Sequence, residues 1–86
     1  MITAAAIRID GKCYTGRTHW DAGNTIPPEL FTPDVVDAVM AGELQGFVTD
    51  DGTFLDRRQA YRHALECGQI RNAAHDKRLR SQMVRL

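Results

Sequence analysis

The sequence predicts an α+β fold in which two β-hairpins form a small antiparallel sheet packed with two to three short helices. Two Asp-Gly turns, Asp10-Gly11 and Asp51-Gly52, each separate a pair of short strand-like segments. Asp-Gly is a strong hairpin signal because glycine tolerates a positive φ. Two apolar segments with helix-capping residues lie before and after the second turn. With 86 residues, the chain is expected to form a single small domain spanning 1–86.

The composition is that of an ordinary soluble protein, with 43% hydrophobic and 26% charged residues. No apolar run approaches the roughly 18 residues needed to cross a bilayer, and the N-terminus lacks the pattern of a signal peptide. Cys13 and Cys67 are expected to be free thiols, so we expect a cytoplasmic protein. A chain this short buries only about 60 to 65% of its unfolded surface, which favours a homodimer or higher homo-oligomer.

Charge is distributed unevenly, although the formal net charge is zero. Residues 1–56 hold three basic and nine acidic residues, whereas residues 57–86 hold eight basic and two acidic ones. Nine of the eleven basic residues are arginine, whose planar guanidinium group suits two-pronged contact with phosphate. The two halves could neutralise each other within the fold or across a dimer, or the C-terminal half could meet an anion.

The first hairpin pairs a strand at residues 2–9 with a return strand at Lys12 to Thr15. Ala5, Ile7 and Ile9 fall on one face of the first strand. Residues 16–24 then place Arg17, His19, Trp20 and Asp21 after a strand end, where functional residues often collect. Trp20, the single tryptophan, is expected to anchor the core or an interface.

Residues 24–33 read as a loop because of Pro27-Pro28. Thr32-Pro33-Asp34 then begins a helix that ends at Gly42. The apolar face of this helix is predicted to consist of Val35, Val36, Val39 and Met40.

The most informative segment is residues 46–70. Phe47-Val48 and Phe54-Leu55 form the second hairpin, and Asp56 with Gln59 has the spacing of a capping box. The helix is predicted to run from Arg57 to about Cys67 and to end at Gly68 in the left-handed conformation. Its buried stripe is predicted to comprise Ala60, Tyr61, Ala64 and Leu65.

Residues 69–86 are compatible with a further helix, basic and amphipathic, broken or frayed near His75-Asp76. It could serve as a docked or oligomer-forming element, or as a nucleic-acid-binding tail. The scattered histidines His19, His63 and His75 have no zinc-site spacing, so no metal and no cofactor is expected.

Aromatic, guanidinium and amide groups gather around the second hairpin and its helix. This combination suits a ligand with flat bases and phosphates. Arg57, Arg58 and Arg17 are the candidates for phosphate contact, and Phe47, Tyr61 and Trp20 are the candidates for stacking on a base. Asp21 and Gln69 could bond ribose hydroxyls or a base edge. The alternative is that the arginines are solvated and the aromatic side chains belong to the core.

The order of these segments resembles the anti-Thoeris sponge proteins of phages, of the first-described type, over residues 2–22 and 45–70. The similarity rests on Arg17-x-His19-x-Asp21, Gln45-Gly46-Phe47, Phe54-x-x-Arg57, Ala60-Tyr61 and Cys67-Gly68-Gln69. This resemblance implies a dimer or an assembly of dimers that sequesters a cyclic ADP-ribose isomer, and in some members cyclic oligonucleotides, without hydrolysing it. It adds His19 and Gln45 to the expected ligand-binding residues. The intervening segment with Pro27-Pro28 and the tail are short here, so residues that the family takes from those regions cannot be assigned.

Two other functions fit the sequence. The acidic N-terminal half could imitate nucleic acid in a phage inhibitor that acts by direct protein contact, as anti-CRISPR proteins do. The basic tail could instead serve a small nucleic-acid-binding accessory protein, although nucleic acid is the less expected partner. An enzyme is the least expected class, because no nucleophile or metal motif is present.

Overall fold

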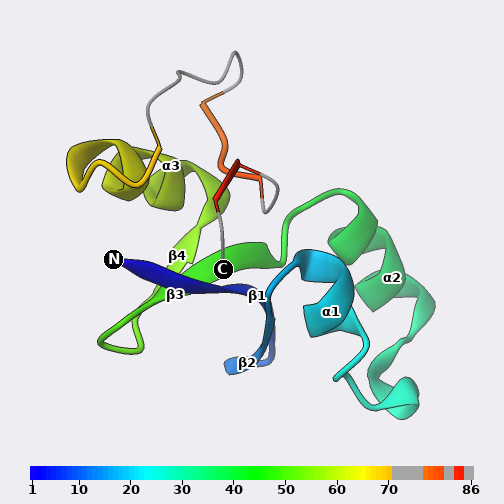
Figure 1. The fold of residues 1–86 in the computed structure, drawn as a ribbon. Coiled ribbons are helices and arrows are strands. Elements are labelled where there is room, and N and C mark those ends of the chain that lie inside the picture. Colours follow the sequence, from blue (N-terminus) through cyan, green and yellow to red (C-terminus); the bar gives the residue numbers. More distant parts are fainter. Residues whose placement is uncertain (71–76, 81–82, 85–86) are drawn as a thin grey trace.

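The computed structural model describes residues 1–70, 77–80 and 83–84. Its elements, in chain order, are β1 (Ile2–Ile9), β2 (Lys12–Gly16), α1 (His19–Gly23), the 3₁₀ turn η1 (Pro28–Leu30), α2 (Pro33–Met40), β3 (Gln45–Thr49), β4 (Phe54–Asp56) and α3 (Arg57–Glu66). Figure 1 shows α3 on one side of the molecule and α1 with α2 on the other, around a central sheet.

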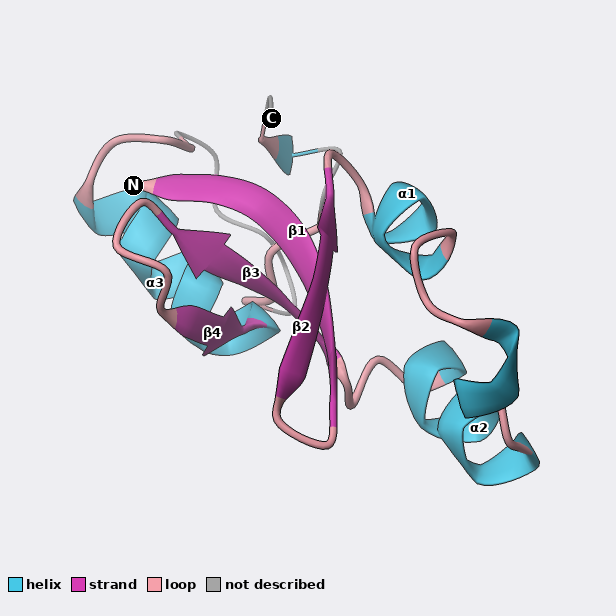
Figure 2. Ribbon diagram, turned by 90° about the horizontal axis from the view of Figure 1, so that it is seen from below, coloured by secondary structure: helices cyan, strands magenta, loops and turns pink. Residues whose placement is uncertain are grey.

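The sheet has four antiparallel strands in the order β2-β1-β3-β4, which confirms the predicted pair of hairpins (Figure 2). The first hairpin turns through Asp10 and Gly11, both with positive φ, as a primed two-residue turn requires. The two hairpins join through β1 and β3, where Ala5 lies opposite Phe47 and Ala6 lies opposite Gly46. The outer strands β2 and β4 are the edges of the sheet.

One face of the sheet carries both hydrophobic cores. Ala5 belongs to the core beneath α3, and Ile7 and Ile9 belong to the core beneath α1. These three residues alternate along β1 without interruption, so α1 and α3 cover the same face side by side. The register shifts between Ile2 and Ala4, and this bulge returns Ile2 to the α3 core.

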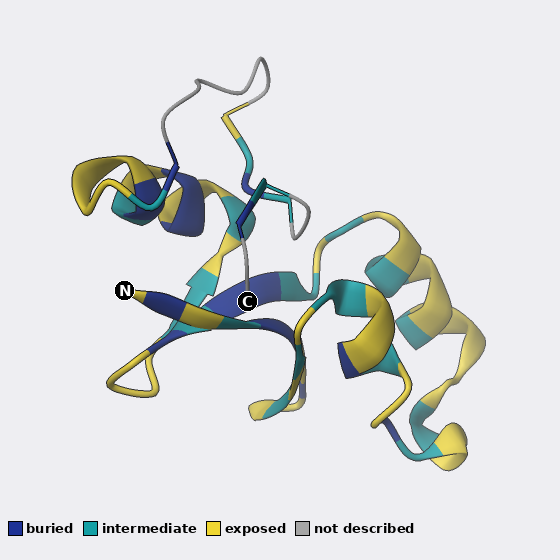
Figure 3. Cartoon of the chain, in the orientation of Figure 1, coloured by how far each residue is buried: buried dark blue, intermediate teal, exposed yellow. Residues whose placement is uncertain are grey.

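The core beneath α3 is built on Phe47, the largest fully buried side chain, together with the helix residues Ala60, Tyr61 and Ala64. Leu79 and Val84 from the C-terminal segment complete it. Figure 3 shows this buried stripe of α3 facing the sheet. The core beneath α1 and α2 is smaller and contains Ala22 and Ile26.

The opposite face of the sheet carries a stacked pair formed by Phe54 and Arg8. Gly46 lies under the Phe54 ring, and a Cβ atom on Gly46 would come within 2.2 Å of the Leu55 carbonyl oxygen and 2.4 Å of the ring. The Arg8 guanidinium carbon lies 4.4 Å from the centroid of the same ring. Glycine at position 46 therefore allows Phe54 to lie flat across β3.

The predicted helix boundaries are confirmed at most ends. Thr32 caps α2 through a bond from the Val35 amide, and Asp56 and Gln59 form the complete capping box of α3. Gly42 and Gly68 follow their helices with positive φ. Between β2 and Pro27-Pro28, the structure contains the short helix α1, for which no boundary was predicted and whose N-cap is Thr18.

The predicted apolar faces are corrected at three positions. Val36 and Met40 of α2 and Leu65 of α3 are exposed, by 40%, 81% and 39% respectively. Only Val35 and Val39 of α2 pack against the core, because α2 lies at the end of the sheet and meets it along a narrow strip. Leu65 lies at the edge of the stripe that α3 buries.

The helix predicted for residues 69–86 is wrong at Lys77–Arg80, whereas Met83 lies in a 3₁₀ turn whose amide donates to the Arg80 carbonyl at 2.9 Å. Lys77–Arg80 have no helical structure, and Lys77 has a φ of 55°. Residues 71–76, 81–82 and 85–86 lie outside the described part of the chain, including the predicted break at His75-Asp76. The apolar residues Ile70, Leu79 and Val84 nevertheless pack against the sheet-facing side of α3.

Candidate functional site

The first turn of α3 sets the position of the two central arginines. The Asp56 carboxylate accepts a bond of 2.8 Å from the Gln59 amide, and the Gln59 side chain accepts one of 3.0 Å from the Asp56 amide. This reciprocal pair fixes where the helix begins. Arg57 is half-buried and Arg58 is exposed.

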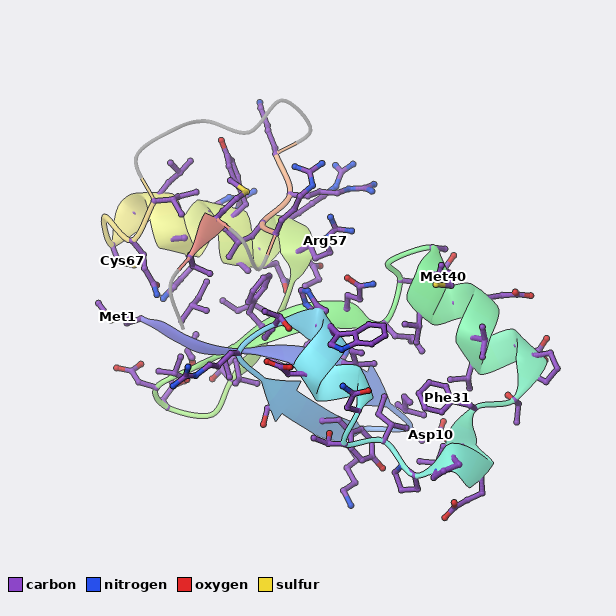
Figure 4. All side chains as sticks on the ribbon, turned by 45° about the vertical axis from the view of Figure 1, so that its right-hand side comes forward. Met1, Asp10, Phe31, Met40, Arg57 and Cys67 are labelled. Atoms are coloured by element: carbon purple, nitrogen blue, oxygen red, sulfur yellow. The ribbon has the colours of Figure 1, made fainter. Side chains whose placement is uncertain are left out.

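Arg57 joins three parts of the chain. Its Nε donates to the Leu79 carbonyl at 3.3 Å, and its own carbonyl accepts from the Leu79 amide at 2.9 Å. A Cβ on Gly42 would lie 2.7 Å from one of its terminal nitrogens, so the guanidinium rests against the loop after α2. Figure 4 shows Arg57 among a group of nitrogen-tipped side chains above the sheet. Because Leu79 is fully buried, this tie holds Lys77–Arg80 beside α3.

Two pockets flank Arg58. The Arg57 pocket, of about 180 Å³, is lined by Ala41, Gly42, Glu43, Gln45, Asp56, Arg57, Arg58 and Arg78. The Tyr61 pocket, of about 370 Å³, is lined by Arg58, Tyr61, Arg62, Leu65 and Lys77. Arg58 borders both pockets, and the consecutive residues Lys77 and Arg78 line one each. We refer to the two pockets together as the α3 groove.

The two pockets differ in charge. The Arg57 pocket sets three guanidinium groups against the carboxylates of Glu43 and Asp56. The Tyr61 pocket is lined by the cations Arg58, Arg62 and Lys77, and none of its described lining residues is a carboxylate. Leu65, 39% exposed, supplies apolar surface, whereas Tyr61 borders the pocket with only 6% of its area exposed. An anion with an apolar part therefore fits the Tyr61 pocket, and polar hydroxyl groups fit the mixed Arg57 pocket.

Four of the predicted ligand-binding residues, Gln45, Arg57, Arg58 and Tyr61, line the groove. The Gln45 side-chain nitrogen donates to the Val39 carbonyl at 2.9 Å, so this amide also joins α2 to β3. Arg57 and Tyr61 line different pockets, and Arg58 is the residue that the two pockets share.

Phe47 and His19 are in the interior instead. Phe47 is fully buried, so stacking on a ligand by this ring is excluded. The His19 ring lies edge-on to Phe47 at 4.9 Å between centroids, and its Nε2–H donates to the Gly46 carbonyl at 2.8 Å. Burial lowers the pKa of His19 below 6.5; the bond to Gly46 opposes this, and the nearby charge of Arg57 adds to it. His19 therefore links α1 to the sheet beside Arg57.

Arg17, Trp20 and Asp21 are exposed on or just before α1, and they do not line either pocket. Trp20 is 79% exposed, which corrects the expectation that it anchors the core. An interface role for Trp20 stays a prediction.

Gln69 has a structural partner far from the groove. Its side-chain oxygen accepts from the Ile2 amide at 2.9 Å, and its nitrogen donates to the Ile2 carbonyl at 2.7 Å. Both ends of this amide therefore hold the start of β1 against the end of α3.

Three further residues line the groove but are not among the predicted ligand-binding residues: Arg62, Lys77 and Arg78. Arg62 lies one turn after Arg58, so the helical period could have identified it. Lys77 and Arg78 reach the groove only through the packing of Leu79 against α3, and no local sequence pattern reports that contact.

Comparison with known proteins gives one relationship. No curated protein and no solved structure matches the chain. No helix in the described residues is long and apolar enough to span a membrane, and no group of three potential metal ligands occurs in that part of the chain. The family model described as phage T4 y16D protein matches residues 1–84. The chain therefore belongs to the phage T4 y16D protein family.

Proposed function

We propose that this protein is a sponge: it binds a nucleotide-like anion in the α3 groove and sequesters it without transforming it. The supporting observation is the Tyr61 pocket, where three cations lie beside the exposed side chain of Leu65 and no described lining residue is a carboxylate. A nucleotide presents the same two chemistries, a charged phosphate and a flat apolar base.

The groove supplies enough interactions for tight binding. Charge-assisted hydrogen bonds contribute about 1.5 to 3 kcal/mol each. Arg58 can serve a phosphate in either pocket, with Arg62 and Lys77 beside it in the larger one. Several such contacts approach the roughly 12 kcal/mol of a nanomolar complex, before the entropic costs of association.

The resemblance to anti-Thoeris sponge proteins narrows the ligand class. Cyclic ADP-ribose isomers carry two phosphates, two riboses and an adenine in one compact ring. The positively charged Tyr61 pocket suits phosphate and adenine, and the mixed Arg57 pocket suits ribose hydroxyls. The ligand of this proposal is therefore a cyclic nucleotide signal, and the biological role is suppression of a host defence that depends on it.

Calorimetric titration with cyclic ADP-ribose isomers, a cyclic dinucleotide and ADP tests the proposal. The Arg58→Ala variant should bind the preferred ligand about 10-fold to 100-fold more weakly, as expected for the loss of one charge-assisted contact. Lys12→Ala is the matched control, because Lys12 is an exposed cation at the far hairpin and should leave affinity unchanged.

Mass spectrometry of ligand released by heat tests sequestration. The released ligand should have its original mass after prolonged incubation with the protein. Failure of all these nucleotides to bind, equal affinity in Arg58→Ala, or recovery of a cleaved product would each overturn the proposal.

A further inference from the structure

Trp20 presents a large apolar side chain to solvent. It is the single tryptophan of the chain, and 79% of it is exposed on the short helix α1. Tryptophan is among the residues most enriched at the energetic centres of protein interfaces. This exposed indole is therefore the side chain that we consider as one half of a docking contact.

The stretch of chain that carries Trp20 is acidic. Residues 18–56 contain eight carboxylates and no lysine or arginine; Arg17 is the last cation before Arg57. Asp21 is the neighbour of Trp20 and is exposed, and the exposed residues Asp34 and Asp37 lie on α2. A partner for this surface should therefore combine an apolar hollow with positive charge.

The Tyr61 pocket has these properties. Leu65, 39% exposed, provides apolar surface beside the largely buried Tyr61, and Arg58, Arg62 and Lys77 provide the charge. A guanidinium group is a favourable neighbour for the face of an indole, and the ammonium group of Lys77 is a suitable partner for Asp21. Trp20 does not line this pocket in its own chain, so a second molecule must supply the indole.

We propose that Trp20 of one copy docks in the Tyr61 pocket of a second copy. The contact joins two unlike surfaces, and each copy carries both. Association therefore proceeds to a closed dimer with two reciprocal contacts, to a ring, or to an open chain of copies where the rotation does not close. A symmetric contact between two α1–α2 surfaces is disfavoured, because it would bring carboxylates of both copies together.

Complementation between two variants tests this geometry. Trp20→Asp removes the indole, and the double variant Arg58→Glu, Arg62→Glu reverses the charge of the pocket. All three positions are exposed, so both variants should melt cooperatively near the wild-type temperature. Analytical ultracentrifugation should show that the wild type associates, that each variant alone is monomeric, and that a mixture of the two forms a 1:1 heterodimer through the one intact contact.

Fluorescence supplies a second measurement, because Trp20 is the sole indole. Its emission should shift to shorter wavelength as the wild-type concentration rises, and added salt should reverse the shift. A wild type that stays monomeric at its highest soluble concentration overturns the proposal. Association that survives in Trp20→Asp, or a mixture that stays monomeric, overturns it equally.

This proposal is independent of the nucleotide proposal, since association is measured without ligand. A base and an indole would occupy the same apolar surface, so a nucleotide that enters the Tyr61 pocket should dissociate the assembly. Association without nucleotide binding, or nucleotide binding without association, separates the two proposals.

Discussion

His19 is the residue whose surroundings most clearly set its protonation state. Burial against Phe47, together with the charge of Arg57, keeps its pKa below the ordinary value of 6.5. The folded state therefore favours the neutral ring. The stability that follows is complete above about pH 6.5 and is lost as the pH falls through the lowered pKa, since the unfolded chain then binds the proton more readily.

We predict that the free energy of unfolding falls between pH 7 and pH 5 and that His19→Gln flattens this dependence. Urea unfolding at a series of pH values measures it. Glutamine can still donate to the Gly46 carbonyl but does not titrate.

Asp51 provides the matched control for that experiment. Hydrogen bonds from Thr49 and Thr53 lower the pKa of its carboxyl group to about 2 from the ordinary 3.8. Its contribution is present above about pH 4 and is lost only as the pH falls towards 2. Asp51→Asn should leave the pH 5–7 slope intact, and a slope that survives in His19→Gln would contradict the assignment to His19.

The positions of the residues on α3 can be predicted from the sequence, because the start and the period of this helix are known. Arg57, Arg58 and Tyr61 line the groove because the capping box fixes the phase of α3, and their role in ligand binding stays a prediction. Phe47 was misassigned since the strand pattern does not say which face of β3 receives α3. The placement of Trp20 depended on how α1 packs, which no residue near it in the sequence determines.

Among the elements, the β3–β4 hairpin is tightly packed at Gly46. Gly46→Ala should destabilise the protein by about 2 kcal/mol or more, because its Cβ would meet both the Leu55 carbonyl oxygen and the Phe54 ring. Thermal and urea unfolding measure the loss.

Gly52→Ala in the turn of the same hairpin separates crowding from backbone strain. Gly52 has a φ of 84° and open space around its Cβ position, so alanine there should cost only about 1 kcal/mol, from the left-handed conformation. Equal losses in the two variants would show that Phe54 does not lie across Gly46.

The elements were predictable where a local signal marks both ends. Asp-Gly turns, Thr and Asp caps, and glycines after helices all appear at the expected positions. The C-terminal segment has an amphipathic composition but a path set by tertiary contacts. Leu79 packs under α3 and bonds the Arg57 backbone, which holds Lys77–Arg80 out of a helix.

For the molecule as a whole, Leu79 connects stability with the groove. Leu79→Ala should cost about 2 to 5 kcal/mol, since the side chain is fully buried. It should also weaken ligand binding, because the segment carrying Lys77 and Arg78 loses its anchor. Calorimetry and urea unfolding of the same sample measure both effects.

Leu65→Ala is the contrasting variant. Leu65 lines the Tyr61 pocket but is 39% exposed, so its truncation should reduce affinity with little loss of stability. If Leu79→Ala binds ligand as tightly as the wild type, the C-terminal segment is not part of the site.

The paired bonds between Gln69 and Ile2 have a consequence for exchange of amide hydrogens with deuterated solvent. Terminal residues usually exchange at once because their ends fray. The Ile2 amide donates to a side chain 67 residues away, so it should open only when α3 separates from β1. Its exchange rate, read by NMR, should match that of the α3 amides and rise sharply in Gln69→Leu. Ile2, near the start of the chain, would then report on the opening of the whole α3 core.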